Sequence, residues 1–503
     1  MIFPATYARI KEIYAQRPAL VLQDVSYTYK ELDACVQKIV VILNEEGLSN
    51  RGHVIAVAEE PQLFSYAAII AVLVSGNALL PLNKEFPRDR NSYMLQKAKP
   101  VMFLSTAYDA EIQALLHDVA ELEISWYTQT RCEKHPEKTK EGASYPDIAY
   151  ILFTSGSTGY PKGVPVSHRN LDGCLNFFLR HYDFNEEDRF LQVYNTTFDV
   201  FYFSFIMPLM VGACCYFVNG GKAGLKYLQI FKALQQYKIT VVSMVPTLLL
   251  FAEKYLNQFT YPYLRYSFFS GDALLHAIAT KWKRCFPNGA LHNFYGPTET
   301  TIVCTRYVWE EGKSLEESHH DVVPLGIPFE GMQYLLINDQ HQTVSKGEIG
   351  ELAFTGIQVI ERYVDNEHSD KFFIDSSSGL SYYKTGDLAF VNQRGSLVFS
   401  GRKDFQHKVH GYRIELAEVE LAISSIVQQP CYAVVHRNKS GLNVLYAMVL
   451  KHSMSEKEIV AALKQKVPHY MIPRRILQLE EFPVNSNNKV DRLLLNEIVY
   501  NVE

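Results

Sequence analysis

One glycine-rich segment of the chain carries the residue types that bind phosphate. It reads Phe153-Thr154-Ser155-Gly156-Ser157-Thr158-Gly159-Tyr160-Pro161-Lys162-Gly163. Glycines let a backbone turn closely and present N–H groups to an anion, and the hydroxyls and the lysine add donors and positive charge. The segment is not a Walker A loop, because Pro161 stands where that pattern needs a glycine before the lysine. The same composition is also typical of a solvated turn, so its meaning depends on the rest of the chain.

Four later segments have chemistry of their own. In 293–301 an aromatic residue precedes a Gly-Pro turn and a carboxylate follows it, which suits stacking on a purine and holding a cation. In 383–388 an aspartate after a glycine is placed to accept both hydroxyls of a ribose. Segments 401–415 and 487–492 are rich in charge. Each of the four, taken alone, also fits an ordinary turn or a solvated loop.

The composition describes a globular protein of several domains. A length of 503 residues suggests about two to four domains. The net charge of −5 gives no reason to expect a nucleic acid partner. The eight cysteines are scattered without metal-ligand spacing, and the start of the chain lacks the pattern of a signal peptide. We therefore expect reduced thiols and a cytoplasmic location.

Two long apolar runs imitate membrane spans. Residues 200–218 carry no charge, but Pro208 and Gly212 interrupt the run, and its end favours a strand. Residues 63–82 are similar, with Gly76 between a helix pattern and a strand pattern. The sequence predicts a buried helix followed by a buried strand in both places, and no membrane insertion.

The order of apolar runs predicts the fold class. Strand-like runs alternate with helical stretches, which favours stacked α/β layers with largely parallel sheets. The predicted strands of this part are 54–58, 101–104, 148–153, 213–218, 240–244 and 266–270. The polar stretch 132–144 is predicted to be a surface loop.

The last third of the chain has a different pattern of apolar and polar residues. Short strands with turns at 334–337, 350–355, 388–391 and 397–400 predict a small β-rich subdomain. After residue 403 the pattern predicts a compact α+β module behind a mobile linker. It has helices from Glu415 and over 456–466 and strands at 431–436 and 443–450.

In their order and spacing, the five chemical segments resemble the motifs of the adenylate-forming enzymes, which include acyl-CoA synthetases, luciferases and nonribosomal-peptide adenylation domains. The resemblance covers nearly the whole chain, from Tyr27-Thr28-Tyr29-Lys30-Glu31-Leu32 to Arg492. It implies a large N-terminal domain, residues 1–403, a small mobile C-terminal domain, residues 404–503, and a site between them.

The resemblance also implies a reaction. In this family a carboxylate attacks the α-phosphate of ATP and releases pyrophosphate. Because two anions must meet, catalysis needs positive charge and positioning more than a proton donor. The implied binding residues are Thr154, Ser155, Gly156, Ser157, Thr158, Gly159 and Lys162 for the phosphates, Gly271, Asn293 and Tyr295 for adenine, Asp387 and Arg402 for ribose, Thr298 and Glu299 for Mg²⁺, and Lys489 between substrate carboxylate and phosphate.

Family members then rotate the C-terminal domain so that a thiol attacks the adenylate. Asp404 matches the hinge of that rotation, and Lys408 and Gly411 match the face used afterwards. A hinge needs only a few residues that absorb a backbone change. Asp404 is also compatible with a static turn.

Asp199 points to the subfamily. Amino-acid-activating members carry an aspartate at this position, which pairs with the α-ammonium of the substrate, whereas fatty-acyl and aryl ligases generally do not. A buried carboxylate is costly without a cation, and Asp199 leads into an uncharged run. The positions that match the side-chain pocket carry no charge: Val200, Phe203, Ser243, Phe268, Ser270, Phe294, Ile302 and Val303.

The resemblance therefore implies a small neutral amino acid as substrate: D- or L-alanine, glycine, serine or proline. The two pocket serines are also compatible with satisfying backbone groups, the commoner role of buried hydroxyls. Because the sequence ends soon after Arg492, we expect a free-standing ligase that loads the phosphopantetheine arm of a separate carrier protein. Residues 408–413 are similar to D-alanine–carrier protein ligases, but Ser270 replaces a pocket cysteine of those enzymes, which counts against D-alanine itself.

Two other functions stay open at this point. One is an acyl- or aryl-CoA synthetase of the same superfamily, against which Asp199 argues. The other is a nucleotide-binding regulator without chemistry. Lys489, Glu299 and Asp387 argue against a regulator, because binding alone would not need all three.

Overall fold

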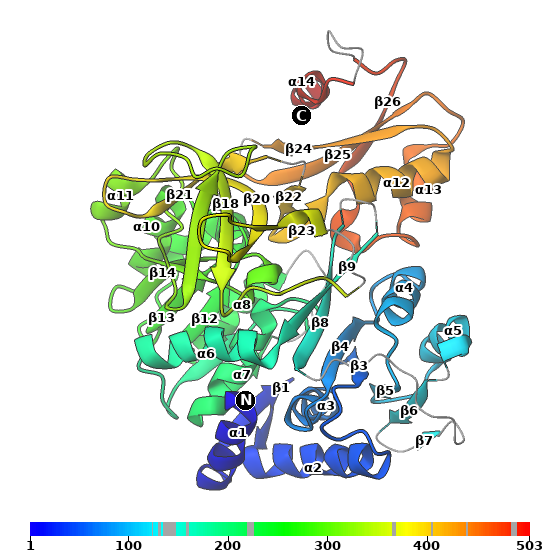
Figure 1. Cartoon of the computed structure of the whole chain (residues 1–503), viewed down its shortest axis with the longest axis vertical. Coiled ribbons are helices and arrows are strands. Elements are labelled where there is room, and N and C mark those ends of the chain that lie inside the picture. Colours follow the sequence, from blue (N-terminus) through cyan, green and yellow to red (C-terminus); the bar gives the residue numbers. More distant parts are fainter. Residues whose placement is uncertain are drawn as a thin grey trace. The chain divides into compact units, whose positions relative to one another are not determined.

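The computed structural model of the chain, drawn in Figure 1, describes most of its residues. The described part leaves out residues 123, 129–131, 134–146, 157–159, 219–225, 365–368, 404–405, 439–440, 484–489 and 503, and the side chains of 132, 133, 226 and 369. The chain forms two compact units. The first is Met1–Asn83, Leu95–Leu152 and Gly163–Lys403, and the second is Lys84–Met94, Phe153–Lys162 and Asp404–Glu503.

A nine-stranded sheet positions most of the candidate residues. In spatial order its strands are β16 (Ile327–Pro328), β15 (Thr305–Val308), β14 (Ala290–Tyr295), β13 (Tyr266–Phe269), β12 (Val241–Met244), β10 (Arg189–Gln192), β11 (Cys214–Phe217), β1 (Pro18–Leu22) and β2 (Val25–Thr28). The strands from β14 to β1 are parallel, and β15, β16 and β2 are antiparallel additions at the edges. In such a sheet ligands bind outside the carboxyl ends of the strands.

The second large sheet has seven strands. Its order is β7 (Cys132–Glu133), β6 (Ser125–Thr128), β5 (Met102–Ser105), β3 (Val54–Glu59), β4 (Ala78–Asn83), β8 (Ile148–Thr154) and β9 (Lys162–Ser167). Parallel pairing joins β6 to β5, β5 to β3, β3 to β4 and β4 to β8. The predicted strands at 54–58, 101–104 and 148–153 are confirmed. The predicted loop at 132–144 is wrong at its start, because Cys132–Glu133 pairs with β6, and the rest lies outside the described residues.

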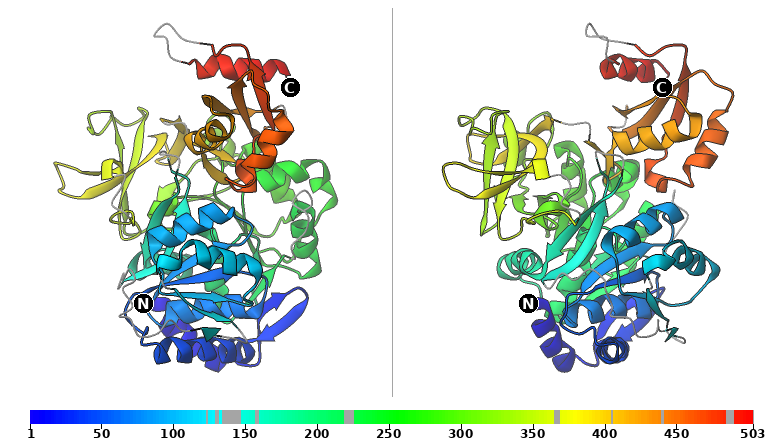
Figure 2. Two further views of the ribbon diagram at one scale, coloured as in Figure 1. Left: turned by 90° about the vertical axis from the view of Figure 1, so that its right-hand side faces the viewer. Right: turned by 45° about the vertical axis from the view of Figure 1, so that its right-hand side comes forward.

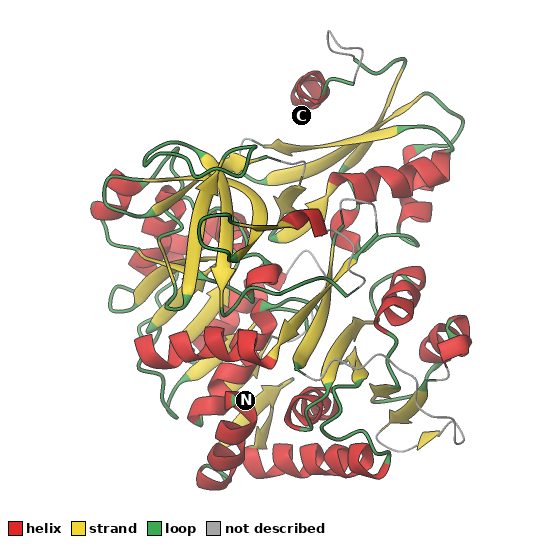
Figure 3. Ribbon diagram, viewed as in Figure 1, coloured by secondary structure: helices red, strands yellow, loops and turns green. Residues whose placement is uncertain are grey.

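Helices alternate with these strands, as the red and yellow elements of Figure 3 show. Those before residue 320 are α1 (Ile2–Ile13), α2 (Tyr29–Glu45), α3 (Leu63–Val74), α4 (Arg88–Ala98), α5 (Ala110–Asp118), α6 (His168–His181), α7 (Val200–Val211), α8 (Lys226–Gln236), α9 (Thr247–Ala252), α10 (His276–Cys285) and α11 (Lys313–Glu317). Capping boxes begin two of them, Thr28 with Glu31 at α2 and Ser167 with Asn170 at α6.

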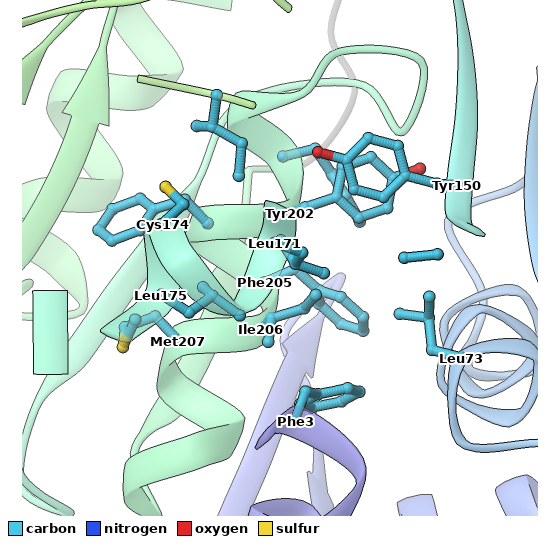
Figure 4. Packing of buried hydrophobic residues seen from close by; sticks show 14 of the residues in the cluster. Phe3, Leu73, Tyr150, Leu171, Cys174, Leu175, Tyr202, Phe205, Ile206 and Met207 are labelled. Atoms are coloured by element: carbon cyan, nitrogen blue, oxygen red, sulfur yellow. The ribbon is translucent and has the colours of Figure 1, made fainter. Parts of the chain in front are cut away.

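Helix α7 is apolar on every side because it is buried. It begins after Asp199 and ends at Gly212, whose φ of 79° suits glycine. Figure 4 shows its side chains Tyr202 and Phe205 in the core, and the Tyr202 ring stacks on Tyr150 at 4.2 Å between centroids. Strand β11 follows, which confirms the predicted helix and strand within 200–218. Across the described parts of the chain, no helix combines the length and apolar character needed to cross a membrane.

The predicted β-rich part is an antiparallel five-stranded sheet. Its strands are β17 (Met332–Ile337), β18 (Gly350–Gly356), β19 (Phe372–Ile374), β20 (Ser381–Val391) and β21 (Leu397–Arg402). All four strands predicted between 334 and 400 lie within these elements. Together with the two larger sheets they confirm the predicted α/β fold class.

The C-terminal part of the second unit is an α+β module. It contains β22 (Gln406–Val409), β23 (Tyr412–Glu415), α12 (Leu416–Val427), β24 (Cys431–Arg437), β25 (Asn443–Leu450), α13 (Glu456–Leu463), β26 (Arg475–Leu479) and α14 (Arg492–Val502). Helices α12 and α13 pack on one face of the sheet β24-β25-β26, and α14 packs on the other (Figure 2). The predicted elements of this module are present, although the helix predicted over 456–466 ends at Leu463. The mobility of the module stays a prediction.

Candidate active site

Asp387 is held by two neighbours in the first unit. It lies in β20 opposite Arg402 in β21 and is 5% exposed. The Arg402 guanidinium pairs with Oδ1, and the Tyr295 hydroxyl, at the end of β14, donates to Oδ2. Burial and then the Asp387 carboxylate raise the pKa of Tyr295 well above its ordinary value, so the hydroxyl keeps the proton that it donates. Because each carboxylate oxygen has a second lone pair, Asp387 retains capacity for further hydroxyl donors.

Asn293 presents a fixed oxygen on the same strand. Its amide nitrogen donates to the carbonyl oxygens of Pro324 at 2.9 Å and Val323 at 3.4 Å. Its Oδ1 is buried and has no hydrogen-bond partner among the described residues. Such an oxygen is an acceptor for an amino group, for example that of adenine. Gly271 lies at the end of the neighbouring strand with a φ of 86°, a conformation that favours glycine.

Glu299 is a fully buried carboxylate in the single turn Thr298–Thr300. It is 0% exposed, and the Tyr363 hydroxyl donates to its Oε1 at 2.8 Å. Its backbone carbonyl accepts the Ile360 N–H at 3.0 Å, so the turn is tied down at two points. Within the described residues, no group of three or more His, Cys, Asp or Glu side chains is suited to hold a metal. One carboxylate with the half-buried Thr298 beside it fits Mg²⁺, which takes most of its ligands from waters and phosphates.

The loop after this turn is strained. Thr301 and Ile302 have φ values of 60° and 67°, which are unusual for β-branched residues. The Gln358 side chain, 0% exposed, donates to the carbonyl oxygens of Thr300 and Thr301 at 3.2 Å and of Val303 at 2.8 Å. The Thr301 hydroxyl donates to the Gln358 carbonyl at 2.6 Å. Gln358 therefore holds the backbone that presents Ile302 and Val303.

Asp199 stands at the N-terminus of α7, beyond the carboxyl end of β10. Its Oδ1 accepts the Val200 N–H at 2.8 Å, and the position favours negative charge. The carboxylate acts electrostatically on the hydroxyls of Tyr150 and Tyr194 and on the Cys174 thiol, adding to the rise in pKa that burial causes in each. Asp199 is half-buried, less deeply than the sequence predicted.

An aromatic cluster lies at helix α7, which Asp199 precedes. It consists of Phe178, Phe203, Phe268 and Phe294. Phe203 of α7 lies 5.8 Å from Phe268 of β13, and Phe268 lies 5.3 Å from Phe294 of β14, measured between ring centroids. Phe178 of α6 is 4.2 Å from Phe203 and 5.2 Å from Phe294. The structure thus brings three predicted pocket residues together at neighbouring elements, and Phe178 was not predicted.

Ser243 and Ser270 lie on the adjacent strand ends with a third hydroxyl. Ser243 is in β12, and Ser270 follows β13 directly. Both are 4% exposed. The Tyr194 hydroxyl lies beside both serines. We call Tyr194, Ser243 and Ser270 the hydroxyl cluster.

The glycine-rich segment belongs to the second unit. The Ser155 hydroxyl donates to the Arg413 carbonyl at 3.0 Å, and the Gly156 N–H donates to the buried Glu418 carboxylate, which pairs with Arg90. A Cβ on Gly156 would lie 1.9 Å from the Tyr160 carbonyl oxygen, so the turn admits only glycine.

The other predicted phosphate ligands of this segment divide into two groups. The Thr154 hydroxyl is buried without a hydrogen-bond partner in the described part of the chain, and Lys162 is 3% exposed. Ser157, Thr158 and Gly159 lie outside the described residues.

Lys408 and Gly411 lie in a hairpin of the same unit. Val409 pairs with Tyr412, and the two residues between them, His410 and Gly411, have φ values of 54° and 82°. Positive φ at both positions is the signature of a tight two-residue turn that prefers glycine second. Lys408 precedes the turn in β22. Asp404 and Lys489 lie outside the described residues, so the hinge and the bridging lysine stay predictions.

Sequence reasoning missed Gln358 and Tyr194. A polar residue between Ile357 and Val359 in a buried stretch was the available signal for Gln358. Tyr194 had no such signal, because an aromatic residue after an apolar strand is ordinary.

Comparisons with known proteins agree with this geometry. The model of a family described as AMP-binding enzyme matches residues 8–364. A dimodular nonribosomal peptide synthase of Bacillus subtilis (strain 168) is 31% identical over 496 residues, which are 95% of this chain and 20% of that protein. Gramicidin S synthase 1 of Brevibacillus brevis is 29% identical over 98% of this chain and 45% of its own length, so the chain spans less than half of these relatives.

A solved structure covers nearly the whole chain. The Vibrio cholerae adenylation domain AlmE, in complex with glycyl-adenosine-5'-phosphate, is 25% identical with a TM-score of 0.83, over 99% of this chain and 98% of that one. The family match spans more than half of the sequence and includes the segments that carry Asp199, Asn293 and Glu299. The chain therefore belongs to the AMP-binding enzymes, the adenylate-forming superfamily that its motifs resemble.

Proposed function

We propose that this protein activates a small neutral amino acid with ATP and transfers it to a carrier protein. The first step forms an aminoacyl-adenylate and releases pyrophosphate. The second moves the aminoacyl group to the thiol of a phosphopantetheine arm on a separate carrier protein. Both steps use the same acyl group, so one amino-acid site serves them.

Asp199 is the observation that carries the proposal. Its carboxylate stands beyond the carboxyl end of β10, at the start of the helix that carries Phe203 of the aromatic cluster. There the ammonium group of an amino acid would meet Asp199 beside a pocket without charged residues. A carboxylate in such surroundings favours a cation. An acyl or aryl substrate has no cation to offer. The glycyl-adenosine-5'-phosphate bound by the AlmE domain supports a small amino acid.

The nucleotide would be held by fixed acceptors. Asn293 Oδ1, without a partner in the described residues, would accept the adenine amino group, and Asp387, oriented by Arg402, would accept the ribose hydroxyls. Tyr295 would stack on adenine while its hydroxyl keeps Asp387 in place. Each of these groups is buried or pinned, so little reorganisation is needed on binding.

The reacting anions need positive charge. Glu299 with Thr298 would hold Mg²⁺, which when bound neutralises charge on the phosphate oxygens. The hydroxyls and Lys162 of the glycine-rich segment would receive the pyrophosphate end. Lys489 would lie between the substrate carboxylate and the α-phosphate, where its charge counts most as the bonds change.

The thioester step would use the second unit. Asp404 is the proposed hinge, and Lys408 and Gly411 would meet the phosphopantetheine after rotation. A solved nonribosomal-peptide protein that contains adenylation and PCP domains shares this fold, with a TM-score of 0.81 at 22% identity. No disulfide joins the cysteines in the described residues, which suits a cytoplasmic enzyme.

Pyrophosphate release tests the proposal. The purified protein is given ATP, Mg²⁺ and each common amino acid in turn, then fatty or aryl acids with coenzyme A, and then a phosphopantetheinylated carrier protein. We expect release with a small neutral amino acid and aminoacyl thioester on the carrier, detected by intact mass. Release with fatty or aryl acids alone would replace the proposal with a CoA synthetase, and ATP binding without turnover under any condition would replace it with a regulator.

A further inference from the structure

Tyr194 is fixed, like Asp199, beyond the carboxyl end of the interior strand β10. Its backbone N–H donates to Gln192 Oε1 at 2.8 Å, and Gln192 Nε2 donates to the Phe201 carbonyl at 3.1 Å. Gln192 is 2% exposed. One buried amide therefore ties Tyr194, the second residue after β10, to the first turn of α7, which begins after Asp199. The Tyr194 ring packs against both large hydrophobic cores of the first unit.

The hydroxyl cluster has unmet hydrogen-bonding capacity. The Tyr194 hydroxyl lies close enough to Ser243 and Ser270 for both to oppose the rise in its pKa that burial causes. Yet neither the Tyr194 hydroxyl nor Ser270 Oγ has a hydrogen-bond partner of normal geometry in the described residues, although both oxygens are buried. A buried hydroxyl without a partner is destabilising, and such groups are rare in native proteins.

Position makes these oxygens part of the amino-acid site. Ser243 lies in β12, the strand next to β10, and Ser270 directly follows β13, the next strand along. Ser243 also pairs in register with Phe268 of the aromatic cluster. The Asp199 carboxylate acts electrostatically on the Tyr194 hydroxyl. A substrate whose ammonium meets Asp199 would therefore extend its side chain toward the hydroxyl cluster.

We propose that Tyr194 is a specificity-determining residue which, with Ser270, binds the side-chain hydroxyl of a small hydroxy amino acid, serine being the smallest. The inference rests on the proposed function and narrows its substrate. A hydroxyl both donates and accepts, so it satisfies two buried oxygens at once. Alanine and glycine leave both oxygens unpaired, and proline brings only apolar atoms. Sites built to hydrogen-bond a substrate hydroxyl discriminate strongly against analogues that lack it.

ATP–pyrophosphate exchange measures this preference. Initial rates are taken with serine, alanine, glycine and proline, each amino acid in both configurations where it has two, for the wild type, Tyr194→Phe and Ser270→Ala. Tyr7→Phe is the matched control, because the Tyr7 hydroxyl is also buried without a partner in the described residues but lies in α1. Thermal midpoints confirm that each variant is folded.

The measured quantity is the ratio of kcat/KM for serine to kcat/KM for alanine. The wild type prefers serine over alanine in kcat/KM by at least about 10-fold. Tyr194→Phe and Ser270→Ala each lower the kcat/KM for serine about 10- to 100-fold, mainly through KM, and change that for alanine less than about threefold. Tyr7→Phe changes neither.

Three results would overturn the inference. A preference for alanine, glycine or proline would mean that water satisfies the cluster. Equal losses for serine and alanine in both variants would give Tyr194 and Ser270 a structural role. If none of the amino acids supports ATP–pyrophosphate exchange, the proposed function itself is wrong. If some of them support exchange but serine is not preferred, only this inference is wrong.

Discussion

Replacing Gln358 with leucine should loosen the loop 300–303, which forms one wall of the proposed amino-acid site. The two N–H donors of the Gln358 side chain serve three carbonyl oxygens, those of Thr300, Thr301 and Val303. Leucine has a similar volume and no donors. The positive φ values of Thr301 and Ile302 cost about 1–3 kcal/mol each, so the loop is expected to relax once the donors are lost.

The size of the effect follows from the buried groups. Two lost donors at about 1.5 kcal/mol each would destabilise the protein by about 3 kcal/mol. Gln358 Oε1 is buried without a partner in the described residues, and leucine removes that cost of about 1 kcal/mol. The expected decrease in the free energy of unfolding is therefore about 2 kcal/mol.

Urea unfolding and steady-state kinetics measure the two consequences. Gln358→Leu should lower the unfolding free energy by about 2 kcal/mol and raise the KM for the amino acid more than the KM for ATP. Gln333→Leu, an exposed glutamine in β17, is the matched control and should change stability by less than about 0.5 kcal/mol. A loss below about 0.5 kcal/mol with an unchanged amino-acid KM would refute the role given to Gln358.

Two further predictions concern catalysis and pH. Lys489→Ala should abolish adenylation, a loss of about 2–4 kcal/mol in the transition state, while ATP affinity measured by calorimetry stays nearly unchanged; normal exchange rates would remove Lys489 from the mechanism. Burial lowers the pKa of His168 to about 4 and, with Arg306, that of His292 to about 3. Because the unfolded histidines take up protons near pH 6.5, the unfolding free energy should hold above that pH and fall as the pH drops toward about 4. Urea unfolding between pH 7 and pH 5 measures this slope, which should be shallower in His292→Phe; an equal slope would contradict the assignment to His292.

Much of the fold was predictable because its strands are short apolar runs bounded by turns. Strand β25 has the predicted bounds, 443–450, and β12 and β13 differ by one residue at an end. Helix α7 was predictable from its uncharged length together with Pro208 and Gly212. The short pairing of β7 was not, because a strand of two residues is too short to show any periodicity.

The site was predictable only where a motif marks it. The family resemblance assigned Asp387 and Arg402 together to the ribose, and the strand register places them opposite each other. It could not show that Tyr295 donates to Asp387, because their contact joins strands 92 residues apart. Tyr194 and Gln358 were missed for the same reason, since their roles depend on tertiary neighbours.

Recognition of the substrate's ammonium group by Asp199 is the property on which the proposed function depends. The most direct test compares pyrophosphate exchange for the preferred amino acid with exchange for the same acid lacking its amine, in the wild type and in Asp199→Asn. We expect the wild type to favour the amino acid at least about 100-fold in kcat/KM, since removing one partner of a buried charge pair costs about 2–5 kcal/mol. Asp199→Asn should lose most of that preference while its KM for ATP changes little. Equal exchange by the wild type with and without the amine would contradict the account.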